Sequence, residues 1–464
     1  MLTPKKSALL QAFLRALPQS AASRLARAVE VDQLSGGRVL PHDLILGALR
    51  PALPVQTERT PTPLRLFCRP FEDLLVQAQP REKQKGRIAR ASIPLVWRWL
   101  RETLIIDAAE LYASEIKRLV LADRFAESAT RAAEFWTFAS QEIRKAIETD
   151  RKAVRAALQS DVTVADAEEM TLLLSAGPQV VEIQKLLPRR TQQLNEDLLA
   201  QLRGIHDHAA ATQPVFAPYV AVIAMNRLER PWEALKLPQL VTNQTQDTLI
   251  SNTDLGLVGD VLFAKIEAHG NAVRAARHPV FDADALVAHL ADFTELSSRI
   301  VKEIEMRRDG RWGKRLLADR AAVAEAMEGL MEHAPKEVLA MLPVQKSGSY
   351  GGGPLCADLS RPVDEEKAAR GLRYGKLLSG SAHYAAAGSF AASYQTAMDE
   401  VVQHLRGYNE DLIKEMRVPE GERQPATERQ FELATELTAL MFSSEEADHL
   451  RRRARAALAP AVAA

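Results

Sequence analysis

The stretch that decides the fold contains neither glycine nor proline. Residues 95–176 read LVWRWLRETLIIDAAELYASEIKRLVLADRFAESATRAAEFWTFASQEIRKAIETDRKAVRAALQSDVTVADAEEMTLLLSA. They are rich in Ala, Leu, Glu, Lys and Arg, which lose little side-chain entropy in a helix and therefore favour one. Apolar residues recur every three or four positions, at Leu104, Ala108, Tyr112, Ile116 and Leu119 and again at Trp136, Ile143, Ile147, Val154 and Leu158. This spacing predicts amphipathic helices that pack one face against a core.

The same stretch predicts helices of unusual length. One continuous helix over residues 94–159 would be about 100 Å long. A break near residues 122–124 is compatible with the pattern, because helices above about 25 residues are uncommon in compact domains. From Trp136 to Leu158 the apolar repeat is about 3.67 residues, which differs from the 3.5 of a left-handed coiled coil and favours packing within a helical array.

Further helices are predicted downstream. Residues 281–308 form one, with Asp282 as its N-cap and Asp309-Gly310 as its end. Residues 366–417 form another, and a last helical element covers residues 427–458. In the helix over 366–417, small residues spaced by four allow a close approach of a second helix. These residues are Gly371, Gly375 and Ser379.

Strand signals are few. Leu64, Leu66 and Cys68 alternate with polar or aromatic residues, which predicts at most one short extended segment. The fold class is therefore predicted to be all-α. We expect an elongated multi-helix array built on one or more very long helices, with a proline-rich extended N-terminal arm.

Two segments differ from the helical body. Residues 41–80 hold seven prolines together with several Leu and Phe residues, which predicts an extended arm lying on the body or on a partner. Residues 346–361 include SGSYGGGP, which predicts a flexible loop. The chain is therefore divided into residues 1–92 with the N-terminal helices and the arm, residues 93–345 with the central long-helix array, and residues 346–464 with the Gly-rich loop and a C-terminal helical region.

The composition argues against several classes of function. Sixty Lys and Arg residues balance sixty Asp and Glu residues, which argues against a nucleic acid partner. No apolar run approaches the roughly 18 residues that span a bilayer. The two cysteines are too few for a disulfide framework, which favours a reducing compartment. We expect a cytoplasmic protein and leave peripheral attachment to a membrane open.

The first helix is a candidate interaction element. Its apolar face includes Leu10, Phe13 and Leu17, and residues 1–29 contain five Lys and Arg residues but no acidic residue. Such a helix can insert into an anionic membrane surface or serve as a targeting segment. The ordinary interpretation, which we favour, is a helix docked on the body of the protein.

A second candidate follows the proline-rich segment. Cations cluster ahead of two tryptophans, a combination that can hold phosphates or lipid headgroups. The residues are Arg81, Lys83, Lys85, Arg87, Arg90, Trp97 and Trp99. The favoured alternative is a solvated connector followed by tryptophans that anchor in the core.

Catalytic and metal-binding motifs are weak. The sequence has no phosphate-binding loop, nucleophile elbow or dinucleotide fingerprint. His206 and His208 do not share a helical face, and Glu446 with His449 forms a single Glu-x-x-His pair without the second copy that a di-iron site needs. Cys68 has a neighbouring cation that could lower the pKa of its thiol, but a lone cysteine is more often a small buried hydrophobic residue, and we favour that interpretation. We therefore predict no catalytic residue, no metal and no cofactor.

The leading hypothesis is a non-enzymatic helical scaffold, adaptor or tethering protein that acts through protein–protein contacts. The alternative is a peripheral membrane protein that binds anionic lipid through the N-terminal helix and residues 81–101. A second alternative is an all-helical enzyme with a site between helices, for which the histidines and the glutamate named above are the first candidates. We expect a protein partner and leave self-association open.

Overall fold

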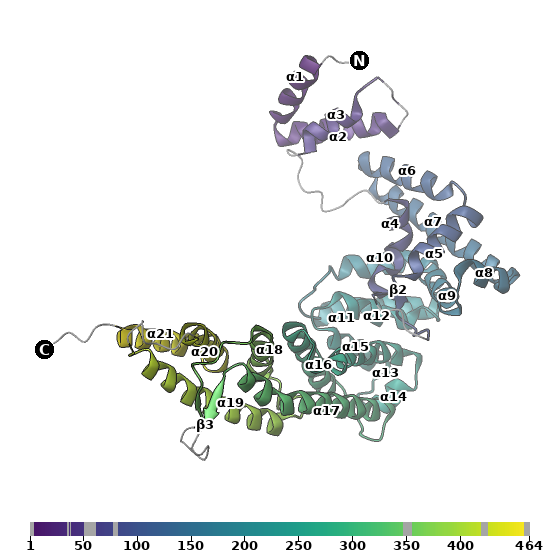
Figure 1. Cartoon of the computed structure of the whole chain (residues 1–464). Coiled ribbons are helices and arrows are strands. Elements are labelled where there is room, and N and C mark those ends of the chain that lie inside the picture. The colour runs from purple at the N-terminus through teal and green to yellow at the C-terminus, as the bar shows by residue number, and fades with distance from the viewer. Residues whose placement is uncertain are drawn as a thin grey trace. The chain divides into compact units, whose positions relative to one another are not determined.

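The part of the chain that the structure describes is mostly helical with very little sheet, which confirms the all-α class. The computed structural model describes residues 4–34, 37, 39–50, 62–77, 82–346, 355–418 and 426–458, and these residues form helices α1–α21 with two short strand pairs (Figure 1). The chain folds as two compact units: unit 1 is Met1–Thr242 with Asp254–Val261, and unit 2 is Asn243–Thr253 with Leu262–Ala464. The three divisions drawn from the sequence stay a prediction. No described helix combines the length and the apolar character that crossing a membrane requires.

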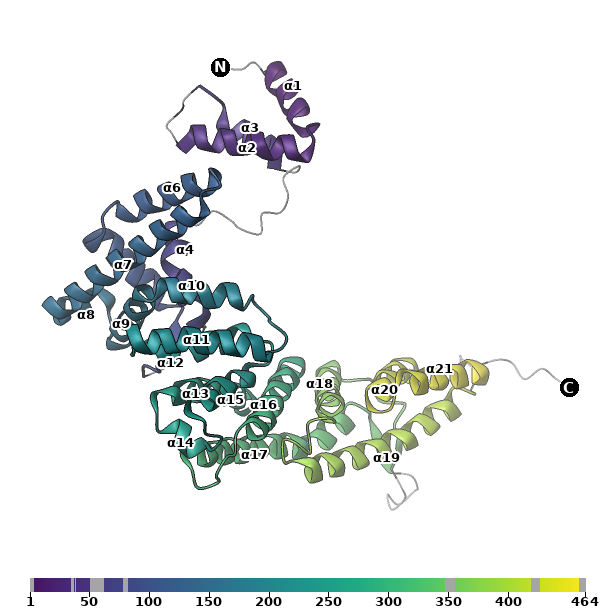
Figure 2. The ribbon, with the colours of Figure 1, turned by 180° about the vertical axis from the view of Figure 1, so that it is seen from behind.

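Unit 1 contains the first thirteen α-helices. They are α1 (Pro4–Arg15), α2 (Gln19–Leu34), α3 (His42–Leu49), α4 (Pro63–Cys68), α5 (Ser92–Trp99), α6 (Ala108–Leu121), α7 (Phe125–Thr149), α8 (Arg151–Leu158), α9 (Asp161–Ser175), α10 (Gly177–Leu186), α11 (Glu196–Thr212), α12 (Ala217–Arg227) and α13 (Lys236–Thr242). Short 3-10 helices cover Arg69–Leu74, Pro231–Leu235 and Asp254–Gly256, and a π-helical turn covers Leu100–Leu104. The helices α10, α11 and α12 pack against one another (Figure 2).

The stretch 95–176 is divided into five helices rather than one. Asp107, Asp123 and Gln159 adopt positive φ angles of 61°, 57° and 67°, which end the helical path without a glycine. The side chains of Asp150 and Ser160 then cap α8 and α9 by accepting from backbone N–H groups at 3.0 Å. The single helix predicted over residues 94–159 is therefore wrong, whereas the break near residues 122–124 is confirmed.

The short extended segment predicted at residues 64–68 is also wrong, because these residues form α4. Thr62 caps this helix by accepting from the Arg65 N–H at 3.3 Å, and Pro63 occupies a first-turn position that tolerates proline. The helix is held from α7 by Trp136, whose indole N–H donates to the Leu66 carbonyl at 2.8 Å. Part of the predicted proline-rich arm is helical in α3 and α4, and residues 51–61 and 78–80 lie outside the described residues.

Two strand pairs were not predicted. In unit 1, β1 (Leu75–Val76) pairs in parallel with β2 (Ile88–Ala89). In unit 2, β3 (Val344–Lys346) pairs antiparallel with β4 (Leu355–Ala357). The predicted Gly-rich loop joins β3 to β4, and its residues 347–354 lie outside the described part of the chain.

Unit 2 contains the remaining helices. They are α14 (Asp247–Ser251), α16 (Ala283–Glu303), α17 (Arg311–Ala340), α18 (Glu365–Ser381), α19 (Ala391–Glu415), α20 (Thr427–Met441) and α21 (Ser444–Leu458), while α15 (Leu257–Ala275) contributes residues to both units. The helix predicted over residues 281–308 is confirmed as α16 at its N-terminus, where Asp282 accepts from the Ala285 N–H at 3.1 Å. The predicted end at Asp309-Gly310 is wrong, because α16 ends at Glu303.

The helix predicted over residues 366–417 is wrong as a single element. It is divided into α18 and α19, and the turn between them includes Ser389 with a φ of 65°. The close approach predicted for the small residues of α18 is confirmed at Gly371, where an added Cβ would lie 2.5 Å from the Met341 sulfur. The helical element predicted over residues 427–458 corresponds to α20 and α21.

Candidate functional site

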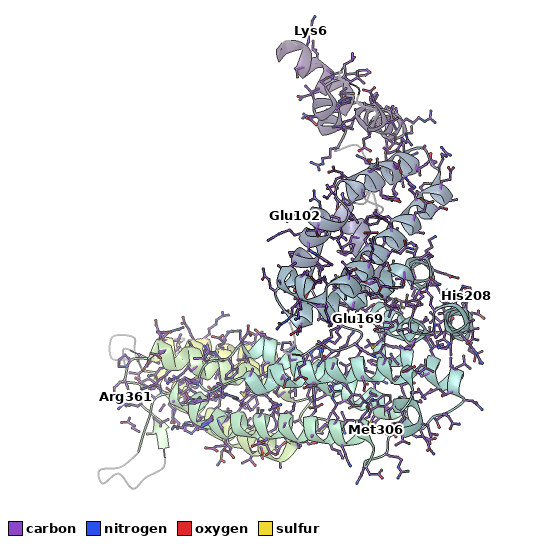
Figure 3. The ribbon with its side chains drawn as sticks, turned by 90° about the vertical axis from the view of Figure 1, so that its right-hand side faces the viewer. Lys6, Glu102, Glu169, His208, Met306 and Arg361 are labelled. Carbon is purple, nitrogen blue, oxygen red and sulfur yellow. The ribbon has the colours of Figure 1, made fainter. Side chains whose placement is uncertain are left out.

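The cations between residues 81 and 90 make up what we call the basic segment. Lys83 connects this segment to two buried carboxylates of α9. Its Nζ donates to Asp166 Oδ1 and Glu169 Oε2, both at 2.5 Å, and to the Arg87 carbonyl at 2.6 Å. Asp166 and Glu169 are three residues apart and therefore lie on one face of α9. Their side chains are 2% and 5% exposed, and Glu169 lies among the helices of unit 1 (Figure 3).

The other oxygens of this carboxylate pair are also occupied. Asp166 Oδ2 accepts from the Ser92 hydroxyl at 2.6 Å and from the Ala89 N–H at 3.2 Å. Glu169 Oε1 accepts from the Gly86 N–H at 2.6 Å and from the Tyr219 hydroxyl at 2.7 Å.

Burial raises the pKa of the Tyr219 phenol above its ordinary value, and the charge of Glu169 raises it further. The phenol therefore remains a donor at neutral pH. We call Lys83, Asp166, Glu169, Ser92 and Tyr219 the lysine–carboxylate network. It fixes residues 83–92 to α9 and α12.

The cations of the basic segment do not all face solvent on one surface. Lys83 belongs to the lysine–carboxylate network, so its expected role as an external cation is corrected. The Arg87 Nη1 donates to Gln84 Oε1 at 2.7 Å. Lys85 and Arg90 are exposed, and Arg81 lies outside the described residues.

The two tryptophans of this segment lie differently. Trp99 is buried at the end of α5, as the core interpretation predicts. Trp97 is half-buried, with its ring centroid 5.3 Å from that of Phe67. The Arg101 guanidinium lies 5.9 Å from the Trp97 ring, a distance at which a cation–π contact is favourable. Both rings therefore serve packing within unit 1.

The first helix has two kinds of apolar residue. Leu10 and Leu17 pack against a small core formed by α1, α2 and α3, which includes Leu14. Phe13 does not take part in this core, since it is 62% exposed, and Leu9 beside it is 65% exposed. Residues four apart are neighbours on a helix surface. Leu9 and Phe13 therefore form an exposed apolar pair, which we call the α1 pair.

The residues considered for metal binding are not brought together. His206 is buried in α11 with Nδ1 3.2 Å from Asp207 Oδ1, whereas His208 lies at the surface (Figure 3). Glu446 and His449 are exposed on α21 and line a cavity of about 270 Å³. Among the described residues, no group of three or more His, Cys, Asp and Glu side chains is arranged to hold a metal ion.

The environment of Cys68 decides between the two interpretations given above. Burial is the main cause that raises the pKa of its thiol to about 12, and the charge of Glu72 acts in the same direction. Arg90 opposes this effect only in part. Activation of this thiol by a neighbouring cation is therefore not found, and burial dominates its environment.

Cys68 is expected to react slowly with iodoacetamide in the folded protein at pH 8. Because the thiolate is the nucleophile, a thiol with a pKa near 12 should react at least about a hundredfold more slowly than the same thiol in the unfolded chain. Mass spectrometry of timed labelling reactions measures this, with the Cys356→Ser variant isolating the signal of Cys68. Equal rates in native buffer and in guanidinium chloride would show that the thiol is not protected.

Comparison of the chain with models of protein families, with curated proteins and with solved structures finds no match.

Proposed function

We propose that the chain is a non-enzymatic helical adaptor or scaffold that acts through protein–protein contacts, and that it works in the cytoplasm. The observation that carries this proposal is the α1 pair. Leu9 and Phe13 are large apolar side chains that remain more than 60% exposed. The core beneath α1 is already filled by other residues, so the pair is available to a partner.

The α1 pair has the chemistry of a helix-in-groove anchor, in which apolar residues on one helix face enter a hydrophobic groove. Burying a large apolar side chain contributes roughly 1.5–3 kcal/mol. Lys6 and Arg15 are exposed on the same helix, and they favour a groove with an acidic rim. In this proposal the longest helices, α7, α17 and α19, supply extended contact surface, and the proline-rich sequence between α3 and α4 serves as the arm.

Photo-cross-linking in the source cells tests the proposal. A benzoylphenylalanine at position 13 should cross-link to one or a few proteins, and the same group at Ala28, exposed on α2, should not. The purified partner should then bind the full chain, and the double substitution Leu9→Asp with Phe13→Asp should weaken binding by at least about a hundredfold. The double substitution Ser20→Asp with Ala28→Asp adds the same charge at exposed positions of α2 and should leave binding unchanged.

The peripheral membrane alternative rests on the same helix, because the α1 pair with nearby cations also suits an anionic lipid surface. Sedimentation with vesicles that contain phosphatidylserine distinguishes the two. Salt-sensitive binding to vesicles that is lost with the Asp substitutions, without any cross-linked protein, would replace the adaptor proposal with the membrane one.

A further inference from the structure

Four basic side chains converge on one cavity of unit 2. Arg274 lies at the end of α15, Arg277 and His278 follow in the next turn, and His333 projects from α17. The cavity has a volume of about 580 Å³, and Asn271 and Glu325 also line it. These side chains come from two segments that are far apart in sequence.

Neither arginine of this cavity forms an ion pair or a hydrogen bond with a carboxylate among the described residues, although Arg274 acts electrostatically on the nearby Asp319. The Arg274 Nη1 donates to Asn271 Oδ1 at 3.2 Å, and the Arg277 Nη1 donates to the Arg274 carbonyl at 2.5 Å. A guanidinium has five N–H donors in a planar fork. Each arginine therefore keeps donors on its other nitrogens for a ligand.

The histidines form an ordered wall. The rings of His278 and His333 stack with centroids 4.3 Å apart and planes inclined by 18°. The His278 Nδ1 lies 2.9 Å from the hydroxyl of the buried Tyr374, which holds this ring in place. His333 is exposed and forms no hydrogen bond with another described residue, so its ring nitrogens are available to a ligand.

The lining of this cavity has more basic than acidic side chains. Glu337 is buried behind the histidines, with one oxygen 3.3 Å from Arg370 Nε and the other 3.8 Å from His278 Nε2. Glu325 is the one carboxylate that lines the cavity among the residues that the structure describes, and it is exposed. The lining therefore carries two arginines and two histidines against one carboxylate.

We propose that this cavity binds a small phosphate monoester, independently of the function proposed above. Arg274 and Arg277 hold the phosphate oxygens, because the guanidinium fork matches the geometry of a phosphate group. His333 supplies a further hydrogen bond. The volume lies within the roughly 300–1,000 Å³ of small-molecule sites and leaves room for the esterified organic group.

Calorimetric titration of the full chain with inorganic phosphate and with AMP, at low ionic strength, tests the proposal. Both should bind in a saturable manner at one site per chain. Arg274→Gln and Arg277→Gln should each weaken binding at least about tenfold, whereas Arg452→Gln, which removes an exposed cation of α21, should leave it unchanged. Circular dichroism confirms that each variant is folded.

Two further measurements locate the ligand. The ring resonances of His333, identified by their loss in His333→Gln, should move during the phosphate titration. Absence of saturable binding, an equal loss in Arg452→Gln, or a His333 signal that stays fixed would each overturn the proposal. Vesicles that contain phosphatidic acid present the same monoester on a membrane. Binding to these vesicles that depends on Arg274, without binding of phosphate or AMP, would assign the site to a lipid headgroup and overturn the small-molecule proposal.

Discussion

Replacing Lys83 with methionine is expected to lower the free energy of unfolding of unit 1 by about 3–5 kcal/mol. The substitution leaves the buried carboxylates of Asp166 and Glu169 without their shared cation, although the methionine fills a similar volume. The hydrogen bonds from Ser92, Tyr219 and the backbone remain, but they do not supply a compensating charge.

Denaturant unfolding followed by tryptophan fluorescence measures this effect. Four of the five tryptophans (residues 97, 99, 136 and 232) lie in unit 1, so the signal reports mainly on that unit. Lys85→Met is the matched control, because Lys85 is exposed two residues away and its loss should change stability by less than about 0.5 kcal/mol. Adding Glu169→Gln to Lys83→Met should recover part of the loss. Equal stability of the two lysine variants would contradict the electrostatic role of the network.

Replacing Arg227 with methionine is expected to destabilise unit 1 by a similar amount, about 3–5 kcal/mol. The Arg227 Nη1 donates to both oxygens of Asp73, at 2.9 and 3.1 Å, and its Nε donates to the Leu187 carbonyl. The two side chains are 7% and 5% exposed. Gln184 also donates to Asp73 at 3.0 Å, but it is neutral. The substitution therefore leaves a buried carboxylate without a cation.

An exposed pair of the same chemistry provides the control. The Arg453 guanidinium makes two hydrogen bonds of 2.8 Å to Glu410 in unit 2, where both side chains are in contact with solvent. Arg453→Met should cost no more than about 1 kcal/mol because water screens the pair. Arg227→Lys keeps the charge but loses the planar fork, so its stability should lie between those of the wild type and Arg227→Met. A loss at Arg227 no larger than that at Arg453 would show that burial does not decide the effect.

Much of this fold can be predicted from helical periodicity, because the positions of most helices depend on local residue types. The N-cap Asp282 of α16 follows from such a local signal. The end of a helix at residue 159 follows from the sequence, whereas the break at Asp107 could not be predicted from composition. It depends on a non-glycine residue that adopts a positive φ, which L-residues rarely do. The pairing of β1 with β2 involves two residues in each strand, which is too short for an alternation signal.

The candidate sites depend even more on contacts between distant residues. Asp166 lies inside α9 and binds a lysine 83 residues earlier in the chain, a partner that no local pattern indicates. Two acids three residues apart within an apolar helix are the one local sign of this network. The cavity with Arg274 and His333 carries no local sign, since α15 and α17 are separated by another helix. The exposure of Phe13 could not be predicted either, because the apolar stripe of α1 is wider than the core that it covers.

Because α12 is buried, exchange of its backbone amides reports on the opening of unit 1. All residues of this helix except Asn226 are buried, so solvent reaches its amides only when the surrounding helices separate. Exchange of these amides with deuterium therefore requires cooperative opening of the unit rather than local fraying. Because the Tyr219 hydroxyl on α12 donates to Glu169 of the lysine–carboxylate network, the same opening that exposes the amides of α12 also releases this contact of the network that holds residues 83–92.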